Sequence, residues 1–449
     1  MTDVSKPTPL SGFPELLPAQ RFAELAMIQT LTQTFELHGF ANLETRAVEP
    51  LDQLLRKGET SKEVYVLKRL QDDGDGDAGM GLHFDLTVPF ARYVLENAGK
   101  LEFPFRRYQI QKVWRGERPQ HGRFREFTQA DIDVVGQGEL PFHHDVEVAR
   151  VMAEALARLP IPRATLQVNN RKVLEGFYLA LGLADPEAVM RVVDKLDKVP
   201  AEKLVEMLRD EAGVSGDDAA KVLALAEISA PDRSFIERVR ALGASHSLLD
   251  EGLEELGRVI DGCADVAGVD VLVDLRIARG LDYYTGTVFE TRLAGYEQLG
   301  SVCSGGRYDK LASDGRTTYP GVGISLGLSR LVVPLVSDGF GADRSVPSAV
   351  LVALVDEESR GASDAIANSL RAHGVPCEVA ASAQKFGKQI RYAERRGIPY
   401  VLFPGTDGAA HQIKDIRSGD QVDVDPATWT PPAADLTPTV SHSTEESNK

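Results

Sequence analysis

One segment, residues 105–136, limits the folds open to this 449-residue chain more than any other. It reads FRRYQIQKVWRGERPQHGRFREFTQADIDVVG, with a polar stretch at 116–122 in its middle. Aromatic and β-branched residues alternate with polar ones on both sides, which predicts strands at 103–114 and 124–135. Aromatic strands joined by short turns favour an antiparallel sheet over a parallel array of strands and helices.

The second of these strands carries charged side chains on one face. Because side chains alternate along a strand, every second residue shares a face. The residues on this face are Arg123, Arg125, Phe127, Gln129, Asp131 and Asp133. Arginines beside acids do not form a hydrophobic core, so the face is either solvated or binds a zwitterionic, phosphate-bearing ligand.

Two further blocks combine arginines, glycines and tyrosines, namely RGLDYYTGTVFE at 279–290 and SVCSGGRYDKL at 301–311. Gly305 and Gly306 would let the backbone approach a ligand closely. A β-hairpin with tyrosines over its edge would give the same pattern. A third block, GVGISLGLSRL, lacks the spacing of a dinucleotide-binding fingerprint, and the sequence has no GxxxxGK[ST] phosphate loop.

The rest of the first 336 residues mixes helices with these strands. Apolar spacing predicts helices at 19–39 and 144–159, and residues 82–90 have a strand-like pattern. Residues 185–260 are charged and rich in Ala, Leu and Glu, which indicates an inserted helical module.

After a linker at 337–347, buried strands alternate with helices, which predicts a small parallel or mixed sheet. Strands are expected at 349–355, 377–379 and 400–403, and helices at 364–372 and 385–396. Four cations share one face of the second helix, either as a phosphate-binding stripe or as a solvated face. They are Lys385, Lys388, Arg391 and Arg395.

Composition excludes several classes of protein. Asp and Glu number 67 against 50 Lys and Arg, a net charge of −17, which argues against non-specific coating of duplex nucleic acid. Three distant cysteines exclude a disulfide scaffold and a CxxC zinc site, and they suit a reducing cytosol, so a cytoplasmic location is expected. The longest apolar run, 349–355, is far too short to span a bilayer, and no membrane partner is expected.

Four phrases resemble the motifs of histidyl-tRNA synthetases, a family of class II aminoacyl-tRNA synthetases. They are LHFDLTVPFARY (82–93), KVWRGERPQHGRFREFTQADID (112–133), RGLDYYTGTVFE (279–290) and SGGRYD (304–309). The resemblance runs in order over about residues 10–425. It implies an α+β fold, with a class II synthetase antiparallel catalytic sheet flanked by helices, a helical insertion and a C-terminal α/β anticodon-binding domain.

The resemblance also implies domain limits and an assembly. We expect a catalytic domain at 1–336, with the insertion at about 185–260, an anticodon-binding domain at 345–428 and a disordered tail at 430–449. The family forms homodimers through its first motif, so the chain is expected to pair with itself.

The reaction implied is the joining of L-histidine to ATP, with loss of pyrophosphate, followed by transfer of histidine to tRNA(His). Arg115 and Arg279 would be catalytic, holding the α-phosphate and carboxylate region, because preplaced cations stabilise the charged transition state. The remaining ATP-binding residues would be Glu117 and Phe127 at the adenine and Arg123 and Arg330 at the β- and γ-phosphates. Mg²⁺ is expected with the pyrophosphate oxygens, and no protein metal site is expected.

Histidine needs acceptors for its α-ammonium group and both a donor and an acceptor for its ring. The resemblance assigns Asp85, Thr87 and Gln129 to the first task, and Asp133, Tyr283, Tyr284 and Tyr308 to the second. Arg118 and Gln120 would meet the acceptor end of the tRNA, and the cations of helix 385–396 its anticodon arm.

Two departures and two alternatives accompany the resemblance. Ser329 stands where the family usually has glutamate, and Arg46 lies where a proline is common. The alternatives are a non-catalytic regulatory subunit of ATP phosphoribosyltransferase and an RNA-binding sensor module. The presence of Arg279 and of a full strand–helix region after residue 347 favours the enzyme.

Overall fold

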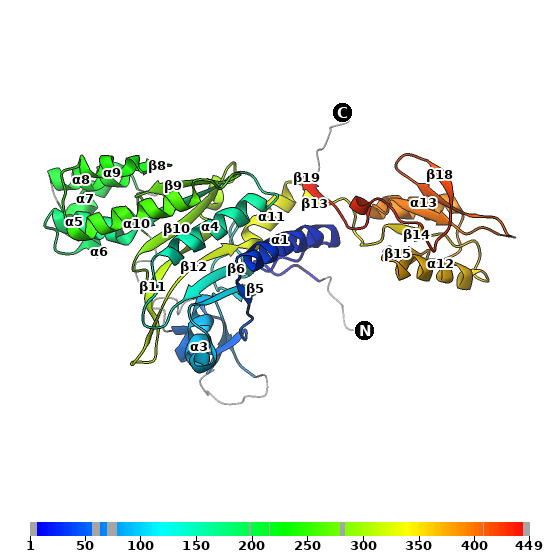
Figure 1. Cartoon of the computed structure of the whole chain (residues 1–449), viewed down its shortest axis with the longest axis horizontal. Coiled ribbons are helices and arrows are strands. Elements are labelled where there is room, and N and C mark those ends of the chain that lie inside the picture. Colours follow the sequence, from blue (N-terminus) through cyan, green and yellow to red (C-terminus); the bar gives the residue numbers. More distant parts are fainter. Residues whose placement is uncertain are drawn as a thin grey trace. The chain divides into compact units, whose positions relative to one another are not determined.

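The computed structural model describes residues 7–55, 63–69, 79–196, 199–214, 216–278, 283–406 and 408–442. The chain divides into two compact units, residues 1–14 with 27–334 and residues 15–26 with 335–449 (Figure 1). Each unit has a sheet of its own and is described by itself. Within the described residues, no helix is long and apolar enough to cross a membrane.

The first unit is built on a large, mainly antiparallel sheet, as the strand pattern predicted. Among the strand pairs that the structure describes in this sheet, only β1–β5 and β7–β9 run parallel. Among the described residues its strand order is β1 (Ala41–Asn42), β5 (Phe105–Trp114), β6 (Glu126–Val135), β12 (Thr318–Gly327), β11 (Cys303–Ser313), β10 (Thr287–Leu293), β7 (Ala164–Asn170), β9 (Asp270–Asp274) and β8 (Ser229–Ala230).

The hairpin of β5 and β6 lies near one edge of this sheet. Its register pairs Arg107 with Asp133 and Gln111 with Gln129, so polar residues of the two strands stand side by side on one face. The connecting loop closes through a small bridge between Gln120 and Arg123, with Gly122 in the left-handed region at φ 72°.

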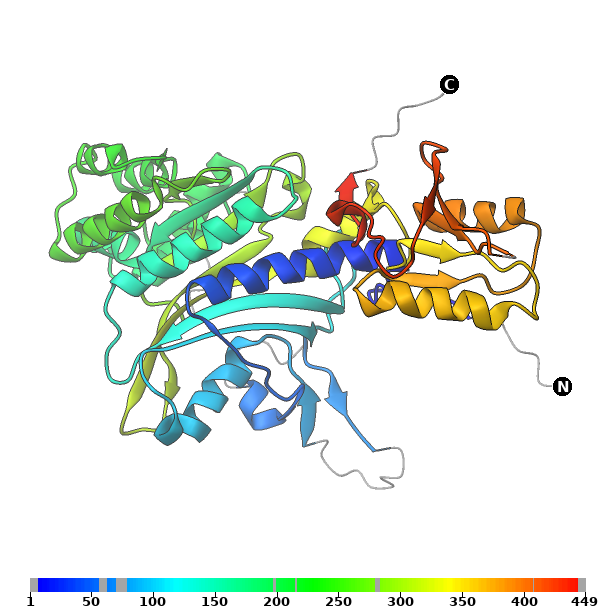
Figure 2. The same cartoon turned by 45° about the vertical axis from the view of Figure 1, so that its right-hand side comes forward.

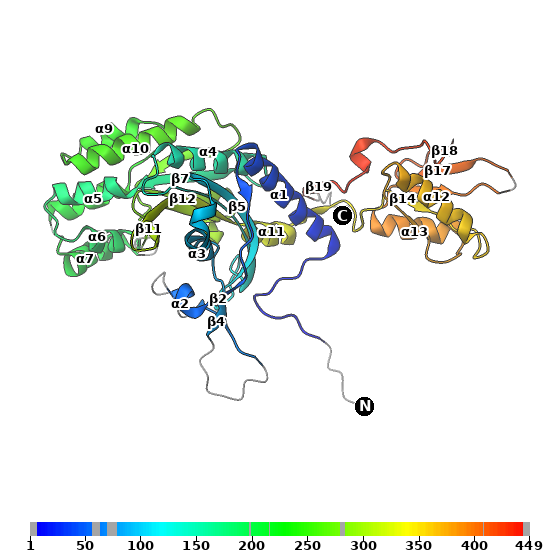
Figure 3. The same cartoon turned by 60° about the horizontal axis from the view of Figure 1, so that its bottom comes forward.

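Helices pack against the large sheet of this unit. α4 (His143–Arg158) buries an apolar face and contacts β12, β6 and β7. α10 (Ser247–Cys263) lies beside α4 and against β7 and β9 (Figure 1). The intervening helices gather with α10 at one end of the unit (Figure 3). They are α5 (Arg171–Ala180), α6 (Pro186–Val193), α7 (Ala201–Ala212), α8 (Asp217–Ala226) and α9 (Ser234–Arg240).

The expectation of a strand at 82–90 is wrong. Only β4 (Met80–Leu82) is a strand, and it pairs with β2 (Val48–Pro50) and β3 (Val66–Leu67) in a small sheet. Residues Thr87–Asn97 form helix α3. The Asp85 carboxylate accepts a hydrogen bond from the Val88 amide at 3.0 Å, which satisfies a free N–H at the helix start.

The N-terminal helix follows the prediction closely. α1 spans Pro18–Leu37, and Gly39 follows at φ 76°, the conformation that commonly ends a helix. In its second half Leu31 and Phe35 are fully buried, and the Phe35 ring lies 5.8 Å from that of Tyr108 on β5.

The second unit has a mixed sheet of strand order β15 (Cys377–Val379), β14 (Val350–Val352), β16 (Tyr400–Phe403), β17 (His411–Asp415) and β18 (Gln421–Val424). The first three strands are parallel and the last two antiparallel. α12 (Arg360–Ala372) packs with Val350 and Val352, whereas α13 (Phe386–Arg396) packs with Leu351. The two helices therefore cover opposite faces (Figure 2).

Part of the tail expected to be disordered from residue 430 is ordered, namely its described residues 430–442. It contains the short helix η5 (Ala433–Asp435) and the strand β19 (Val440–His442), which pairs with β13 (Phe340–Ala342). Asp435 accepts hydrogen bonds from Arg417 at 2.8 Å and from the Tyr400 hydroxyl at 2.7 Å. These contacts hold a segment whose composition alone suggested disorder.

Candidate active site

A cavity in the first unit opens over the hairpin of β5 and β6 and the start of α11 (Leu328–Ser337). Five proposed ATP-binding residues line it together with the proposed histidine ligand Gln129. The other lining residues are small or apolar. The full lining is Arg115, Glu117, Gly122, Arg123, Phe124, Phe127, Gln129, Ser301, Val302, Ser304, Ser325, Gly327 and Arg330.

Arg115 follows directly after β5, and two contacts fix its side chain. Its Nε donates to the carbonyl oxygen of Phe84 at 2.9 Å, and its guanidinium carbon lies 5.1 Å from the centre of the Phe127 ring. The side chain is 31% exposed, so its terminal nitrogens remain accessible to a ligand.

Glu117 lies between two arginines at the cavity. Its carboxylate is 3.5 Å from Nη1 of Arg123 and 4.0 Å from Nη1 of Arg115. These distances are long for ion pairs, and the Arg123 side chain is about half exposed. Such pairs stabilise a fold by only about 0–1 kcal/mol, so a phosphate could displace the carboxylate at little cost.

Arg330 reaches the cavity from the start of α11, far away in sequence. One of its terminal nitrogens donates to the carbonyl oxygen of Leu299. The preceding Ser329, at the position where the resemblance implies a glutamate, accepts a hydrogen bond from the Thr128 amide at 2.9 Å. The shorter side chain therefore still ties α11 to β6 and supports Arg330.

The floor of the cavity is a polar row across β6, β12 and β11. Gln129 donates through Nε2 to the Ser325 hydroxyl at 2.5 Å, and Ser325 pairs in register with Ser304. Sequence reasoning did not assign either serine. Both lie within blocks that it had singled out as unusual, 301–311 and 321–331.

The residues proposed to read the histidine ring do not line this cavity. Asp133 accepts a hydrogen bond from the Tyr308 hydroxyl at 2.6 Å. The Tyr284 ring covers Gly306, where a Cβ atom would lie 2.8 Å from Tyr284 Cδ1. The Tyr283 ring lies 4.2 Å from that of Tyr284. The structure thus gathers these residues into one cluster.

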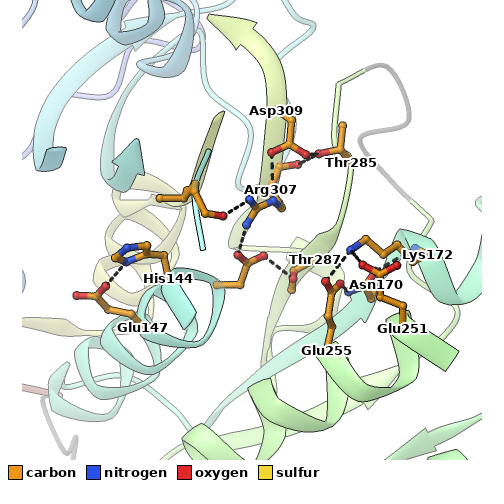
Figure 4. Close-up of polar contacts among 12 residues, drawn as sticks. His144, Glu147, Asn170, Lys172, Glu251, Glu255, Thr285, Thr287, Arg307 and Asp309 are labelled. Carbon is orange, nitrogen blue, oxygen red and sulfur yellow. Dashed lines mark hydrogen bonds and ion pairs between the residues drawn. The ribbon is translucent and has the colours of Figure 1, made fainter. Parts of the chain in front are cut away.

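A second polar network supports β11 beside this cluster (Figure 4). Arg307 Nη1 lies 2.7 Å from the fully buried Asp145 carboxylate, and its Nε lies 3.1 Å from Asp309. Asp145 also accepts a hydrogen bond from the Thr287 hydroxyl at 2.6 Å. These contacts fix the strand that carries Tyr308, the next residue in the chain.

Two of the three proposed ammonium-binding residues, Asp85 and Thr87, lie on one segment that an arginine contacts. Asp85 is buried just before α3, and Thr87 is the first residue of that helix. Arg115 binds the Phe84 carbonyl at 2.9 Å, on the same segment. The remaining proposed catalytic residue, Arg279, lies outside the described residues.

Burial dominates the electrostatics beneath the cavity. Removal from water raises the pKa of Asp131 to about 7, with the neighbouring Asp133 charge adding to the effect and Arg107 opposing it. Burial also raises the pKa values of Tyr284 and Tyr308, which are therefore neutral hydrogen-bonding groups. In the described parts of the chain, no three His, Cys, Asp or Glu side chains are placed to hold a metal ion together.

The proposed tRNA contacts are exposed in both units. Arg118 and Gln120 lie on the loop between β5 and β6. In the second unit, the four cations of the predicted stripe are exposed on or just before α13. The side chain of Arg396, in contrast, is directed to Tyr392 and Glu378.

Comparisons with known proteins agree with this geometry. The histidyl-tRNA synthetase family model matches residues 12–331, and an anticodon-binding domain model matches residues 348–428. The histidine–tRNA ligase of Cutibacterium acnes is 58% identical, over 96% of this chain and 98% of its own length. That of Micrococcus luteus is 57% identical, over 98% and 99%.

Solved structures give the same result. The crystal structure of histidyl-tRNA synthetase from Nostoc sp. PCC 7120 has a TM-score of 0.83 at 33% identity and covers 93% of this chain and 96% of its own. A regulatory subunit/histidyl-tRNA synthetase from Bacillus halodurans, at 21% identity and a TM-score of 0.72, shares the fold. With matches of this extent in both sequence and structure, the chain belongs to the histidyl-tRNA synthetase family.

Proposed function

We propose that this chain is a histidine–tRNA ligase. It activates L-histidine with ATP, releasing pyrophosphate, and then transfers the histidyl group to the 3′ end of tRNA(His). The observation that carries the proposal is the cavity itself, which brings together Arg115, Arg123 and Arg330 from two distant stretches of sequence.

The chemistry needs such a group of cations. When the histidine carboxylate attacks the α-phosphorus, the phosphoryl group gains negative charge and pyrophosphate leaves. Arg115, assisted by Arg279, stabilises the reacting α-phosphate, and Arg123 and Arg330 hold the leaving phosphates. Because arginine binds two phosphate oxygens at once, it positions the phosphates as well as balancing their charge.

The adenine and the amino acid occupy opposite ends of this arrangement. Glu117 accepts from the adenine amino group, and Phe127 stacks on the ring. Asp85, Thr87 and Gln129 accept from the α-ammonium group. Asp133, with Tyr283, Tyr284 and Tyr308, reads the imidazole, and a site built for those hydrogen bonds can discriminate about 10⁴-fold against other side chains.

Mg²⁺ enters with ATP in this proposal. The ion usually keeps several waters and binds substrate phosphates with one or two carboxylates, so it does not need a dedicated protein cage. When bound, it would neutralise phosphate charge beside Arg123 and Arg330, which line the cavity.

The tRNA would be held at both units. Arg118 and Gln120 contact the acceptor end, whereas Lys385, Lys388, Arg391 and Arg395 contact phosphates near the anticodon. In this proposal residues 1–336 are the catalytic domain, with an insertion at about 185–260, and residues 345–428 bind the anticodon. The enzyme acts in the cytoplasm as a homodimer.

The alternative of a non-catalytic regulatory subunit is less well supported. The Bacillus halodurans likeness concerns the fold alone, whereas the ligases from Cutibacterium and Micrococcus match nearly the whole chain at 57–58% identity. Five of the proposed ATP-binding side chains also line one cavity.

Exchange of labelled pyrophosphate into ATP, measured with each of the twenty amino acids in turn, tests the proposal. We expect exchange that depends on histidine alone. Exchange that depends on another amino acid would show that histidine is not the substrate. A protein that catalyses exchange with no amino acid would contradict the proposed activation step.

A further inference from the structure

Arg107 on β5 is an unusual residue beneath the candidate site. Its side chain is 0% exposed and is among the largest fully buried side chains of the described residues. Its Nη2 lies 2.8 Å from Oδ2 of Asp133, which is itself 3% exposed. Burying an arginine costs free energy unless the charge is paired, and even a buried pair adds little to stability. The presence of this ion pair therefore suggests a role other than stabilising the fold.

The contacts around Arg107 hold it in one orientation. Its guanidinium carbon lies 4.3 Å from the centre of the Phe90 ring on α3, and Nη1 donates to Oε1 of Gln109 at 3.3 Å. Nη2 is also 3.4 Å from the carbonyl oxygen of Leu86, between the proposed ammonium ligands Asp85 and Thr87. Arg107 therefore links that segment to Asp133.

The space around Asp133 is arranged for a charged carboxylate. Oδ1 accepts from the Tyr308 hydroxyl at 2.6 Å while Oδ2 faces Arg107, so both oxygens act as acceptors. On the neighbouring strand, a Cβ atom on Gly323 would lie 2.1 Å from Oδ1. The GVGISLG block, which fits no nucleotide fingerprint, thus leaves room here for the carboxylate.

We propose that Arg107 is a positioning residue for amino-acid recognition, which keeps Asp133 ionised and oriented to accept a hydrogen bond from the N–H of an imidazole ring. The inference rests on the proposed function and adds to it a residue that never touches the substrate. Without Arg107, Asp133 would be a buried acid that takes up a proton and then donates instead of accepting.

The other groups facing Asp133 do not replace this charge. Asp131 lies on the same face of β6 and Asp85 lies before α3, and both are acids. Tyr284 and Tyr308 are neutral. β12 contributes Gly321, Gly323 and the uncharged Ser325. Among the described residues that surround Asp133, Arg107 is the cation in contact with it.

The test replaces Arg107 with methionine (R107M), which keeps much of the apolar length but removes the charge. Histidine-dependent pyrophosphate exchange is measured from pH 6 to 9. At pH 7 we expect the KM for histidine to rise about 10- to 100-fold, the scale of one lost charged hydrogen bond, while the KM for ATP changes little. Because raising the pH ionises Asp133 again, this KM should fall toward the wild-type value near pH 9.

Two variants control for structure. R106M makes the same change at the adjacent residue, whose side chain binds Glu147 at 2.9 Å, and should leave the KM for histidine unchanged. R107K keeps the charge and should keep the wild-type pH profile. If R107M does not fold, the double variant R107M/D131N, which buries one negative charge less, should show the same pH-dependent KM.

The outcomes separate the two claims. Wild-type exchange with histidine, together with a KM for histidine in R107M or in R107M/D131N that matches wild type at every pH, overturns the role of Arg107 alone. So does a rise in KM that is equal for both substrates and independent of pH. A wild-type protein that does not use histidine overturns the proposed function and this inference together.

Discussion

The charged residues of the cavity differ from ordinary surface ion pairs in what holds them. Arg115 is held by a backbone carbonyl and an aromatic ring, and Arg330 donates to another backbone carbonyl. Both guanidinium groups line the cavity, where an anion can reach them. Arg107 differs from these two arginines, because its guanidinium group is buried in an ion pair with Asp133.

Arg115 gives the first residue-scale prediction. R115A should slow histidine-dependent pyrophosphate exchange by about 10²–10³-fold, the effect of losing one charge partner of a transition state. The matched control is R118A, three residues further along an exposed loop, which should leave exchange unchanged and reduce only tRNA charging. An R115A protein that folds and exchanges at the wild-type rate would remove Arg115 from the proposed mechanism.

Asp131 gives a second prediction, about pH and stability. Its pKa is raised by burial from 3.8 to about 7, so between these pH values the folded state holds a proton that the unfolded state has released. The stability from this group is fully present below pH 3.8 and is lost as the pH rises through about 7. D131N should therefore become more stable relative to wild type across this window, by up to about 1.4 kcal/mol per pH unit.

Denaturant unfolding of both proteins at pH 5, 6, 7 and 8 provides the measurement. D364N, at an exposed acid on α12, is the control and should track wild type at each pH. A difference between D131N and wild type that stays constant with pH would show that Asp131 is ionised throughout.

At the scale of elements, sequence patterns predicted what depends on local periodicity. The hairpin of β5 and β6, helix α4 and the strand β15 appear within a few residues of their expected limits. The strand expected at 82–90 is wrong because alternation and helical spacing agree over a few residues. The hydrogen bond from the Val88 amide to Asp85, at the start of the helix, favours the helix. The order of residues 430–442 depends on β13 and Arg417, which are distant in sequence.

The candidate site also contains residues that the sequence could predict and one residue that it could not. Motif resemblance supplied the arginines and the residues around histidine, but it could not supply Arg107. That residue is informative only because register places it opposite Asp133 and because three-dimensional packing buries it completely. An arginine within a strand carries no sign of burial in the sequence itself.

Helix α13 gives the element-scale prediction. Reversing two exposed cations in K388E/R391E should weaken tRNA binding at least tenfold and reduce the slope of log affinity against log salt by about 2. Exchange without tRNA should be unaffected. R360E/R371E on α12, with the same change in net charge, should weaken binding less. Equal loss in both variants would point to general repulsion rather than to a contact surface.

At the scale of the whole molecule, the net charge of −17 and the binding of an anionic substrate are compatible because the positive charge is local. Three arginines line one cavity, and four cations are exposed on or beside one helix. Excess acids elsewhere repel nucleic acid, which limits non-specific binding and leaves recognition to these two surfaces. A group of cations in each unit suits a nucleic-acid ligand that the protein contacts at two separate places.

Charging of tRNA tests the central claim most directly. Purified full-length protein is mixed with ATP, Mg²⁺, labelled histidine and a tRNA(His) transcript, and acid-precipitable label is followed with time. We predict that histidine accumulates on this tRNA, that omission of ATP abolishes the signal, and that a tRNA for another amino acid stays uncharged. Absence of label on tRNA(His) under conditions where the protein remains folded would contradict the account.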